Sequence, residues 1–360
     1  MANRILLVDD SALMRSVLGD IINKDKRFHV EDKAKDGIEA LELLRTKQYE
    51  AVVLDINMPR MDGLQLLKTL RDEKIKVRVM VSSTDTTDGS KTAMDALEAG
   101  AIDCVHKPER ASECRGSEFG NEFLETLAGV CAVREAGVQA QTISNRESAM
   151  RSVRQIAEDM GIHQAKVAGN KLVAIASSTG GPKSLQSVIP KLPANLAAPV
   201  VLVQHMPTGF TSSLAERLNS MSRIEVREAR EGEALEAGKV YIAKGGMHMV
   251  ILHQGGRHTV HYKDLPPREN VRPCANYMYE SLTDSRFDEI VCVVMTGMGA
   301  DGEEGIKNLK KRKRVYVISQ NADTCIVYGM PRAVENAGLS DEVIPLDDIA
   351  REIVVNVGTD

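Results

Sequence analysis

Polar residues that could carry out hydrolysis stand directly after apolar segments in the second half of the sequence. Ser177 and Ser178 end one apolar run, His205 ends a second, and Asp301 lies in a glycine-rich segment just beyond a third. A serine hydroxyl is a poor nucleophile unless a base removes its proton, and that base needs a carboxylate that fixes its tautomer. These residue types therefore predict the nucleophile, base and carboxylate of a serine hydrolase.

The spacing leaves several of these roles open. It does not choose between Ser177 and Ser178, and Asp301 could also be the N-cap of the helix that its acidic neighbours begin. The segment Gly297-Met298-Gly299 offers backbone N–H groups that can stabilise an oxyanion. The chain order serine, histidine, aspartate differs from that of the usual α/β-hydrolases. Structural roles are expected for the histidines of the hairpin-like segments, which are His248, His253, His258 and His261.

A second group of polar residues follows the apolar runs of the first half. Asp9, Asp10 and Asp55 would bring like charges together, which is unfavourable unless a cation neutralises them. Hard carboxylate oxygens suit Mg²⁺. Ser82 and Lys107 end two further apolar runs. The group predicts uptake of a phosphoryl group, with Asp55 as the nucleophile and Mg²⁺ and Lys107 stabilising its oxygens.

Both groups require parallel sheets, because the carboxyl ends of parallel strands meet at one edge. Apolar runs alternate with segments of helical period in both halves, and 360 residues exceed what one hydrophobic core usually holds. We predict an α/β fold with two doubly wound parallel-sheet domains. The predicted divisions are a first domain at 1–125, a polar linker at 126–169 and a second domain at 170–360.

The composition limits the partners and the cellular compartment that we expect for this chain. The net charge of −5 gives no general reason to expect a nucleic-acid partner, and no apolar stretch approaches a membrane-spanning length. Six cysteines without a CxxC pair suit a reducing compartment. We predict a cytoplasmic protein with no nucleic acid and no membrane insertion. For the basic run at 307–314, a solvated helix end is favoured over a nucleic-acid patch or a contact with acidic receptor helices.

The first third of the sequence resembles the receiver domain of two-component response regulators, which has a flavodoxin-like fold. The resemblance implies that a histidine kinase phosphorylates Asp55 and that Ser82 and Lys107 sense the phosphoryl group. It also implies that Asp10, Asp55 and the backbone of Asn57 hold Mg²⁺, with Asp9 in support. The matching motifs are Val8-Asp9-Asp10-Ser11, Asp55-Ile-Asn-Met-Pro59 with Asp62-Gly63, Met80-Val-Ser82, Gly100-Ala-Ile-Asp103 and Lys107-Pro108. One departure is Cys104, where receivers often carry an aromatic residue.

The second half resembles the Rossmann-like catalytic domain of chemotaxis protein-glutamate methylesterases. The resemblance selects Ser178 as the nucleophile, His205 as the base and Asp301 as the orienting carboxylate, and it assigns the oxyanion site to the Met298 N–H. The matching motifs are Ala176-Ser-Ser178-Thr-Gly-Gly181, Gln204-His205-Met-Pro207, Gly209-Phe210-Thr211, Arg272-Pro273, Met295 to Gly302, and Gln320-Asn321 through Gly329-Met-Pro331. Cys274 and Asn276 depart from the serine and aspartate common in the family.

Together the two resemblances imply a phosphorylation-activated protein-glutamate methylesterase. Its substrates would be methylated glutamates of chemoreceptors, deamidation of glutamine would be a second activity, and the ester reaction itself would need no cofactor. We hypothesise that the unphosphorylated receiver covers the catalytic mouth. The alternative is a receiver-linked adaptor or binding module with an unused Ser/His/Asp site; a transcription regulator is disfavoured because no DNA-binding helix-turn-helix is readable.

Overall fold

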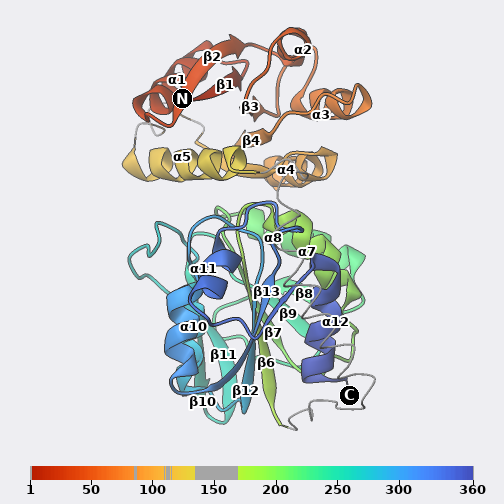
Figure 1. Cartoon of the computed structure of the whole chain (residues 1–360), viewed down its shortest axis with the longest axis vertical. Coiled ribbons are helices and arrows are strands. Elements are labelled where there is room, and N and C mark those ends of the chain that lie inside the picture. Colours follow the sequence, from red (N-terminus) through yellow and green to blue (C-terminus); the bar gives the residue numbers. More distant parts are fainter. Residues whose placement is uncertain are drawn as a thin grey trace.

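Two parallel β-sheets form the framework of this chain in the computed structural model, which describes residues 2–84, 87–108, 110, 114, 116–133 and 169–359. In Figure 1 the first domain, coloured red to yellow, lies against the second, coloured green to blue. The predicted α/β fold class is confirmed. Most of the predicted linker, residues 134–168, lies outside the described residues. None of the described helices is long and apolar enough to cross a membrane.

The first domain is a five-stranded sheet in the order β2-β1-β3-β4-β5, with every neighbouring pair parallel. Apolar residues of α1 and α5 cover one face of the sheet, and those of α2, α3 and α4 cover the other. Its elements are β1 (Asn3–Val8), α1 (Ala12–Lys24), β2 (Phe28–Ala34), α2 (Gly37–Thr46), β3 (Ala51–Asp55), α3 (Gly63–Asp72), β4 (Val79–Thr84), α4 (Thr87–Ala99), β5 (Asp103–Lys107) and α5 (Ser117–Cys131).

Two features of this domain differ from the sequence-based description. The edge strand β2 was not predicted, because only alternate residues such as Phe28 and Val30 are buried and no continuous apolar run forms. The predicted domain end at residue 125 falls inside α5. The helix continues because Leu127 and Val130 pack in the core of the first domain.

The second domain is a seven-stranded parallel sheet in the order β14-β13-β12-β6-β7-β9-β8. Successive residues of β6 face opposite layers: Val173 and Ile175 pack towards α7, α8 and α12, and Leu172 and Ala174 pack towards α9, α10 and α11. An antiparallel hairpin, β10 and β11, carries the four histidines that were expected there.

The elements of the second domain are β6 (Lys171–Ser177), α7 (Gly181–Val188), η2 (Ile189–Lys191), β7 (Val200–Gln204), α8 (Phe210–Met221), β8 (Glu225–Glu228), β9 (Lys239–Ile242), β10 (His248–Gln254), β11 (Arg257–Lys263), α9 (Ala275–Ser281), η3 (Leu282–Asp284), β12 (Glu289–Val294), α10 (Glu303–Lys310), β13 (Arg314–Gln320), α11 (Met330–Asn336), β14 (Glu342–Ile344) and α12 (Leu346–Val357).

The two domains are in direct contact. Helix α4 packs against α7 and α8, and Figure 1 shows α4 and α5 along the side of the first domain that faces them. Glu98 of α4 forms an ion pair with Arg217 of α8. One buried hydrophobic cluster includes residues of both domains. The first domain therefore lies over the edge of the second sheet where the candidate catalytic residues are found.

Candidate active site

The candidate nucleophile and base lie at the ends of adjacent strands. Ser177 of β6 pairs in register with Gln204 of β7, so Ser178 and His205 are the next residue of each strand. The N–H of His205 donates to the carbonyl of Ser177 at 3.1 Å and fixes the two strand ends together. Strand order reverses between β6 and β12, and such switch points form ligand-binding crevices in open α/β sheets.

The structure distinguishes the two adjacent serines. Ser177 is fully buried and its hydroxyl donates to Oε1 of Gln204 at 2.7 Å. Ser178 is partly exposed, and its N–H donates to the carbonyl of Thr296 at 3.0 Å. The hydroxyl of Ser177 is thus used in a hydrogen bond between the ends of β6 and β7, and Ser178 is the accessible serine of the two.

A glycine allows the third strand end to approach Ser178 closely. A Cβ atom on Gly297 would lie 2.7 Å from Cβ of Ser178 and 2.4 Å from Sδ of Met330, which is closer than packed atoms tolerate. The carbonyl of Gly297 accepts hydrogen bonds from the N–H groups of Gly329 and Met330. The segment after β12 is therefore pinned next to the candidate nucleophile.

The side chains of His205 and Asp301 are joined by a hydrogen bond. Nε2 of His205 lies 2.7 Å from Oδ2 of Asp301, and their side chains are 10% and 2% exposed. A carboxylate can only accept, so Nε2 carries the proton and Nδ1 is the basic nitrogen. Among the described residues, no direct hydrogen bond joins Ser178 to His205; such bonds are often long before substrate binds.

Asp301 is held as a carboxylate by four surrounding donors. Oδ2 also accepts from the Ala275 N–H at 2.6 Å, and Oδ1 accepts from the Asn276 N–H at 2.9 Å and from Sγ of Cys274 at 3.1 Å. Burial opposes its ionisation, but the hydrogen bond and charge of His205 and the other donors outweigh burial and lower the pKa of Asp301. The carboxylate is suited to orienting an imidazole and stabilising its charged form.

The predicted oxyanion donor lies on the same glycine-rich segment. A Cβ atom on Gly329 would lie 2.5 Å from the carbonyl of Gly297 and 3.0 Å from Cα of Met298, so the two loops touch. In the part of the chain that the structure describes, the Met298 N–H has no hydrogen-bond partner. This donor is available to a ligand at the Ser178 strand end.

The first domain brings its predicted acidic residues together. Asp9, Asp10 and Asp55 each offer a carboxylate oxygen within 4.8 Å of the others, at the switch point between β1 and β3. Burial raises the pKa of Asp55, and the neighbouring Lys107 opposes that rise. Three converging carboxylates fit the hard oxygen ligands that Mg²⁺ prefers.

Lys107 and Ser82 complete this group. Nζ of Lys107 lies 2.8 Å from both Asp9 Oδ2 and Asp55 Oδ2. Ser82 pairs in register with Asp55, and its buried hydroxyl has no partner among the described residues. Asn57, the remaining predicted residue, is exposed just beyond β3. The unpaired hydroxyl beside Asp55 fits a site that accepts an additional group.

Three residues form a contact between the domains that was not predicted from the sequence. The hydroxyl of Thr179, next to Ser178, donates to the buried carboxylate of Asp103, and the charge of His205 acts on the same carboxylate. A Cβ atom on Gly129 of α5 would lie 2.7 Å from Oγ1 of Thr179. The first domain therefore touches the residue that follows the candidate nucleophile.

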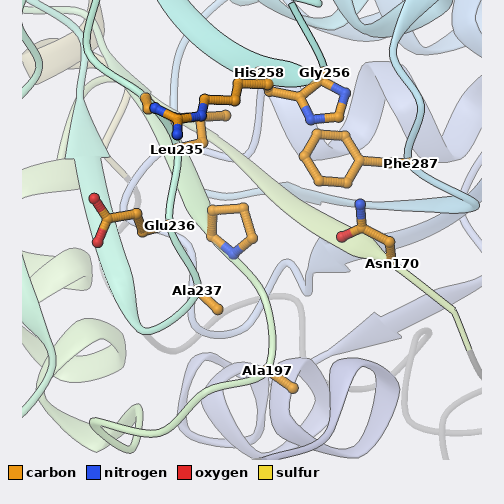
Figure 2. A pocket seen from close by; sticks show the side chains of 11 residues that line it. Asn170, Ala197, Leu235, Glu236, Ala237, Gly256, His258 and Phe287 are labelled. Atoms are coloured by element: carbon orange, nitrogen blue, oxygen red, sulfur yellow. The ribbon is translucent and has the colours of Figure 1, made fainter.

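A cavity of about 470 Å³ lies elsewhere, at the edge of the second sheet where the strands begin (Figure 2). Asn170, His258 and Phe287 are among its lining residues, and the rings of His258 and Phe287 stack with centroids 4.0 Å apart. Burial lowers the pKa of His258 to about 4. The predicted structural role of this histidine agrees with its packing, and the cavity is separate from the candidate active site.

The basic run at 307–314 forms the end of α10 and the start of β13. Several of its charges are paired within the second domain: Lys310 with Asp341, and Arg314 with Glu289. These pairs agree with a helix end whose charges are satisfied internally.

The two sites define a class of protein: a response regulator whose phosphoryl-accepting domain is joined to an α/β domain with a serine, histidine and aspartate group. Comparison with protein families gives matches to the CheB methylesterase family over residues 173–353 and to the response regulator receiver domain over residues 5–116. The chain belongs to the CheB methylesterase family. Both resemblances seen in the sequence are confirmed.

Relatives match over almost the whole chain. A protein-glutamate methylesterase/protein-glutamine glutaminase of Geobacillus kaustophilus is 40% identical over 358 residues, 99% of each chain. One of the same description from Bacillus subtilis is 37% identical over 352 residues, 97% of each chain. The crystal structure of the Thermotoga maritima CheB methylesterase catalytic domain matches with 40% identity and a TM-score of 0.50, covering 52% of this chain and 98% of that one.

Proposed function

We propose that this chain is a phosphorylation-activated protein-glutamate methylesterase that acts on methylated glutamates of chemoreceptors, with glutamine deamidation as a second activity. The observation that carries the proposal is the group of Ser178 and His205, which follow adjacent strands, and Asp301, which lies in the loop after β12 and bonds to His205, in a chain that belongs to the CheB methylesterase family. The proposed substrates are methylated glutamates on the cytoplasmic helices of chemoreceptors, so the proposed activity is located in the cytoplasm.

The chain's own side chains can perform the ester reaction without a cofactor. His205 Nδ1 takes the proton of the Ser178 hydroxyl as Oγ attacks the ester carbonyl, and the Met298 N–H stabilises the oxyanion. Collapse breaks the bond to the methoxy oxygen, which leaves as methanol with the proton from His205. Water then attacks the acyl-enzyme with His205 as base, releasing the glutamate and restoring Ser178. An amide would follow the same path and release ammonia.

The receiver's residues are arranged to accept and hold a phosphoryl group. Asp55 is the nucleophile towards a phosphohistidine of the partner kinase, and Ser82 and Lys107 contact the transferred oxygens. Asp10, Asp55 and the backbone of Asn57 would hold Mg²⁺, with Asp9 in support; the ion would supply positive charge that offsets the developing negative charge on the phosphoryl oxygens.

Regulation follows from the domain contact. Asp103 and Gly129 of the receiver touch Thr179, beside the nucleophile, in an arrangement that would exclude a receptor helix. Phosphorylation of Asp55 would weaken this closed arrangement and shift the population towards an open one. The receiver thereby controls access to the catalytic serine.

Replacement of adjacent serines tests the esterase assignment. Ser178→Ala should remove nearly all release of methanol from methylated receptor, since single knockouts of a triad nucleophile cost on the order of a million-fold in kcat. Ser177→Ala is the matched control: it loses one buried hydrogen bond, worth about 1 kcal/mol of stability, but should keep the activity. Near-normal turnover by Ser178→Ala would refute the assignment. A serine-directed phosphonate should label Ser178 covalently, whereas an adaptor module would not be labelled.

Replacement of the phosphoacceptor tests the regulatory proposal separately. Asp55→Asn keeps the shape of the side chain but cannot form an acyl phosphate. Its methylesterase rate without phosphodonor should match that of the wild type, and a small phosphodonor with Mg²⁺ should no longer stimulate it. The receiver would not be the regulator if Asp55→Asn were stimulated as strongly as the wild type.

A further inference from the structure

The buried thiol of Cys274 contacts the triad carboxylate directly. Cys274 is fully buried, and its Sγ lies 3.1 Å from Oδ1 of Asp301. Its backbone occupies the N-cap position of α9, yet its side chain caps no N–H of that helix. The Asp301 carboxylate does so instead, by accepting from the N–H groups of Ala275 and Asn276. The thiol is thus turned towards the catalytic group.

The four donors around Asp301 divide evenly between its two oxygens. Oδ2 receives the imidazole of His205 at 2.7 Å and the Ala275 N–H at 2.6 Å. Oδ1 receives the Asn276 N–H at 2.9 Å and the Cys274 thiol at 3.1 Å. Without the thiol, Oδ1 would keep a single donor in a fully desolvated place. A buried carboxylate oxygen that loses a donor becomes more basic and less well fixed.

We propose that Cys274 is a positioning residue for catalysis: its S–H donates to Oδ1 of Asp301 and so keeps Oδ2 directed at Nε2 of His205. This role rests on the proposed function of Ser178, His205 and Asp301. Cys274 touches neither substrate nor the reacting atoms and acts only through the carboxylate.

The thiol remains the donor throughout the working pH range. Burial, followed by the charge of Asp301 and the hydrogen bond to it, raises the pKa of Cys274 well above its usual value. Other titratable groups lie near this pair: His205 bonds to Asp301, and the charge of Asp301 also acts on His248 and Tyr279. Oδ1 of Asn276 accepts from the N–H groups of Gly302 and Gly305. Of the side chains that donate to Asp301, His205 takes part in proton transfer and Cys274 does not.

The expected signature is a shift in the pH profile. Cys274→Ala removes one stabilising donor, so the Asp301 carboxylate attracts the protonated imidazole of His205 more strongly. The acid limb of kcat/KM should therefore move upward by about half to one pH unit. We expect kcat to fall about tenfold while KM changes less than about twofold, because no substrate contact is lost. Cys274→Ser restores a donor and should return the acid limb to the wild-type position or below it.

Cys292→Ala is the matched control. Cys292 is another fully buried cysteine of the same domain, in β12, and it makes no hydrogen bond to the triad among the described residues. Both alanine variants lose the same side-chain volume and should lower Tm by comparable amounts. Only Cys274→Ala should move the acid limb.

The experiment measures methanol release from methylated receptor by the full chain, with saturating phosphodonor, from pH 5 to 9. The downfield imidazole N–H resonance of His205, observed by proton NMR, reports the His205–Asp301 bond independently of turnover. An unmoved acid limb and an unmoved resonance in Cys274→Ala would overturn the positioning role. If Cys274→Ala does not fold, an upward shift in Cys274→Ser would overturn it equally.

A Ser178→Ala sample in the same series separates the two proposals. If Ser178→Ala stays active, the proposed function fails and the role of Cys274 fails with it. If Ser178→Ala is inactive and the acid limb of Cys274→Ala matches that of Cys292→Ala, only the positioning role is refuted.

Discussion

Adding one methyl group to α5 should activate this enzyme without phosphorylation. Gly129 lies so close to the second domain that a Cβ atom there would be 2.7 Å from Oγ1 of Thr179 and 3.4 Å from its Cβ and Cγ2 atoms. The side chain of Thr179 is short, β-branched and buried, so it cannot swing aside freely. Gly129→Ala must therefore separate α5 from the turn that carries Ser178.

The size of the effect follows from the cost of overpacking. Inserting a methyl group into a closely packed contact typically costs about 1–3 kcal/mol. The open arrangement has no such contact, so the whole cost falls on the closed one. A change of about 1–3 kcal/mol shifts an equilibrium by roughly 5- to 150-fold. The rate of methanol release without phosphodonor should rise by a factor in that range, up to the limit set by the fully open enzyme.

The assay compares unphosphorylated and phosphorylated rates on methylated receptor for two alanine variants of α5. Gly120 is the matched control: it lies in the same helix, and a Cβ atom there would meet nothing within 4 Å. Each substitution adds about 1 kcal/mol of helix propensity, so that contribution cancels in the comparison. The phosphorylated rate should be the same in both variants, because the open arrangement is unaffected.

Equal unphosphorylated rates in Gly129→Ala and Gly120→Ala would refute this reasoning. That result would mean that the contact between α5 and Thr179 does not limit access to Ser178. A loss of the phosphorylated rate in Gly129→Ala alone would also contradict it, since the methyl group would then be disturbing the catalytic turn rather than the domain contact.

Two further substitutions probe the same region. Burial raises the pKa of Asp103 from 3.8 to about 6, so the closed arrangement is favoured while Asp103 is protonated and weakens as pH rises through that interval. The ratio of the unphosphorylated rate to the phosphorylated rate, measured at each pH, should therefore increase between about pH 4 and 6 and stay constant above pH 6. Asp103→Asn should abolish this increase. The same pH profile in Asp103→Asn and in the wild type would contradict the role of the contact. Gly297→Ala would bring a methyl group 2.7 Å from Cβ of Ser178; we expect kcat to fall at least about tenfold with a folded protein by circular dichroism, and unchanged turnover would show that the Ser178 position is not critical.

The central strands of both domains could be predicted because they are buried on both faces and appear as continuous apolar runs. Three of the four edge strands, β2, β8 and β14, could not. In β2 buried apolar residues alternate with exposed polar ones, β8 has Val226 as its single apolar residue, and β14 has only three residues, so none of them forms a long apolar run. Alternation with a period of two was the signal for β2, where Phe28 and Val30 are buried and His29 and Glu31 are exposed.

The candidate site was predictable to the extent that its residues stand at strand ends. A parallel sheet brings such residues together whatever their separation in sequence, which is why Ser178, His205 and Asp301 could be grouped. The choice between Ser177 and Ser178 needed the family resemblance, and the hydrogen bond from Ser177 to Gln204 supplies a physical reason for it. The donors to Asp301 had no local signal, since they depend on where α9 begins.

The domain contact could not be predicted at all from local patterns. Asp103 and Gly129 belong to ordinary strand and helix segments, and their significance depends on how one folded domain docks on another. Asp103 in particular reads as the first residue of a strand. Only the docked arrangement places its carboxylate against Thr179.

Strand β5 offers a short connection between the proposed phosphoryl site and the candidate active site. Lys107 at its end bonds to Asp55, and Asp103 at its start accepts from Thr179. This strand is at the edge of its sheet and pairs only with β4, so it can shift at the cost of a single set of ladder hydrogen bonds. If Lys107 exchanged the Asp55 carboxylate for phosphoryl oxygens, as proposed above, a displacement of β5 would reach Thr179 directly. We infer that the receiver acts on the residue beside the nucleophile through β5, as well as through the packing of α4 and α5.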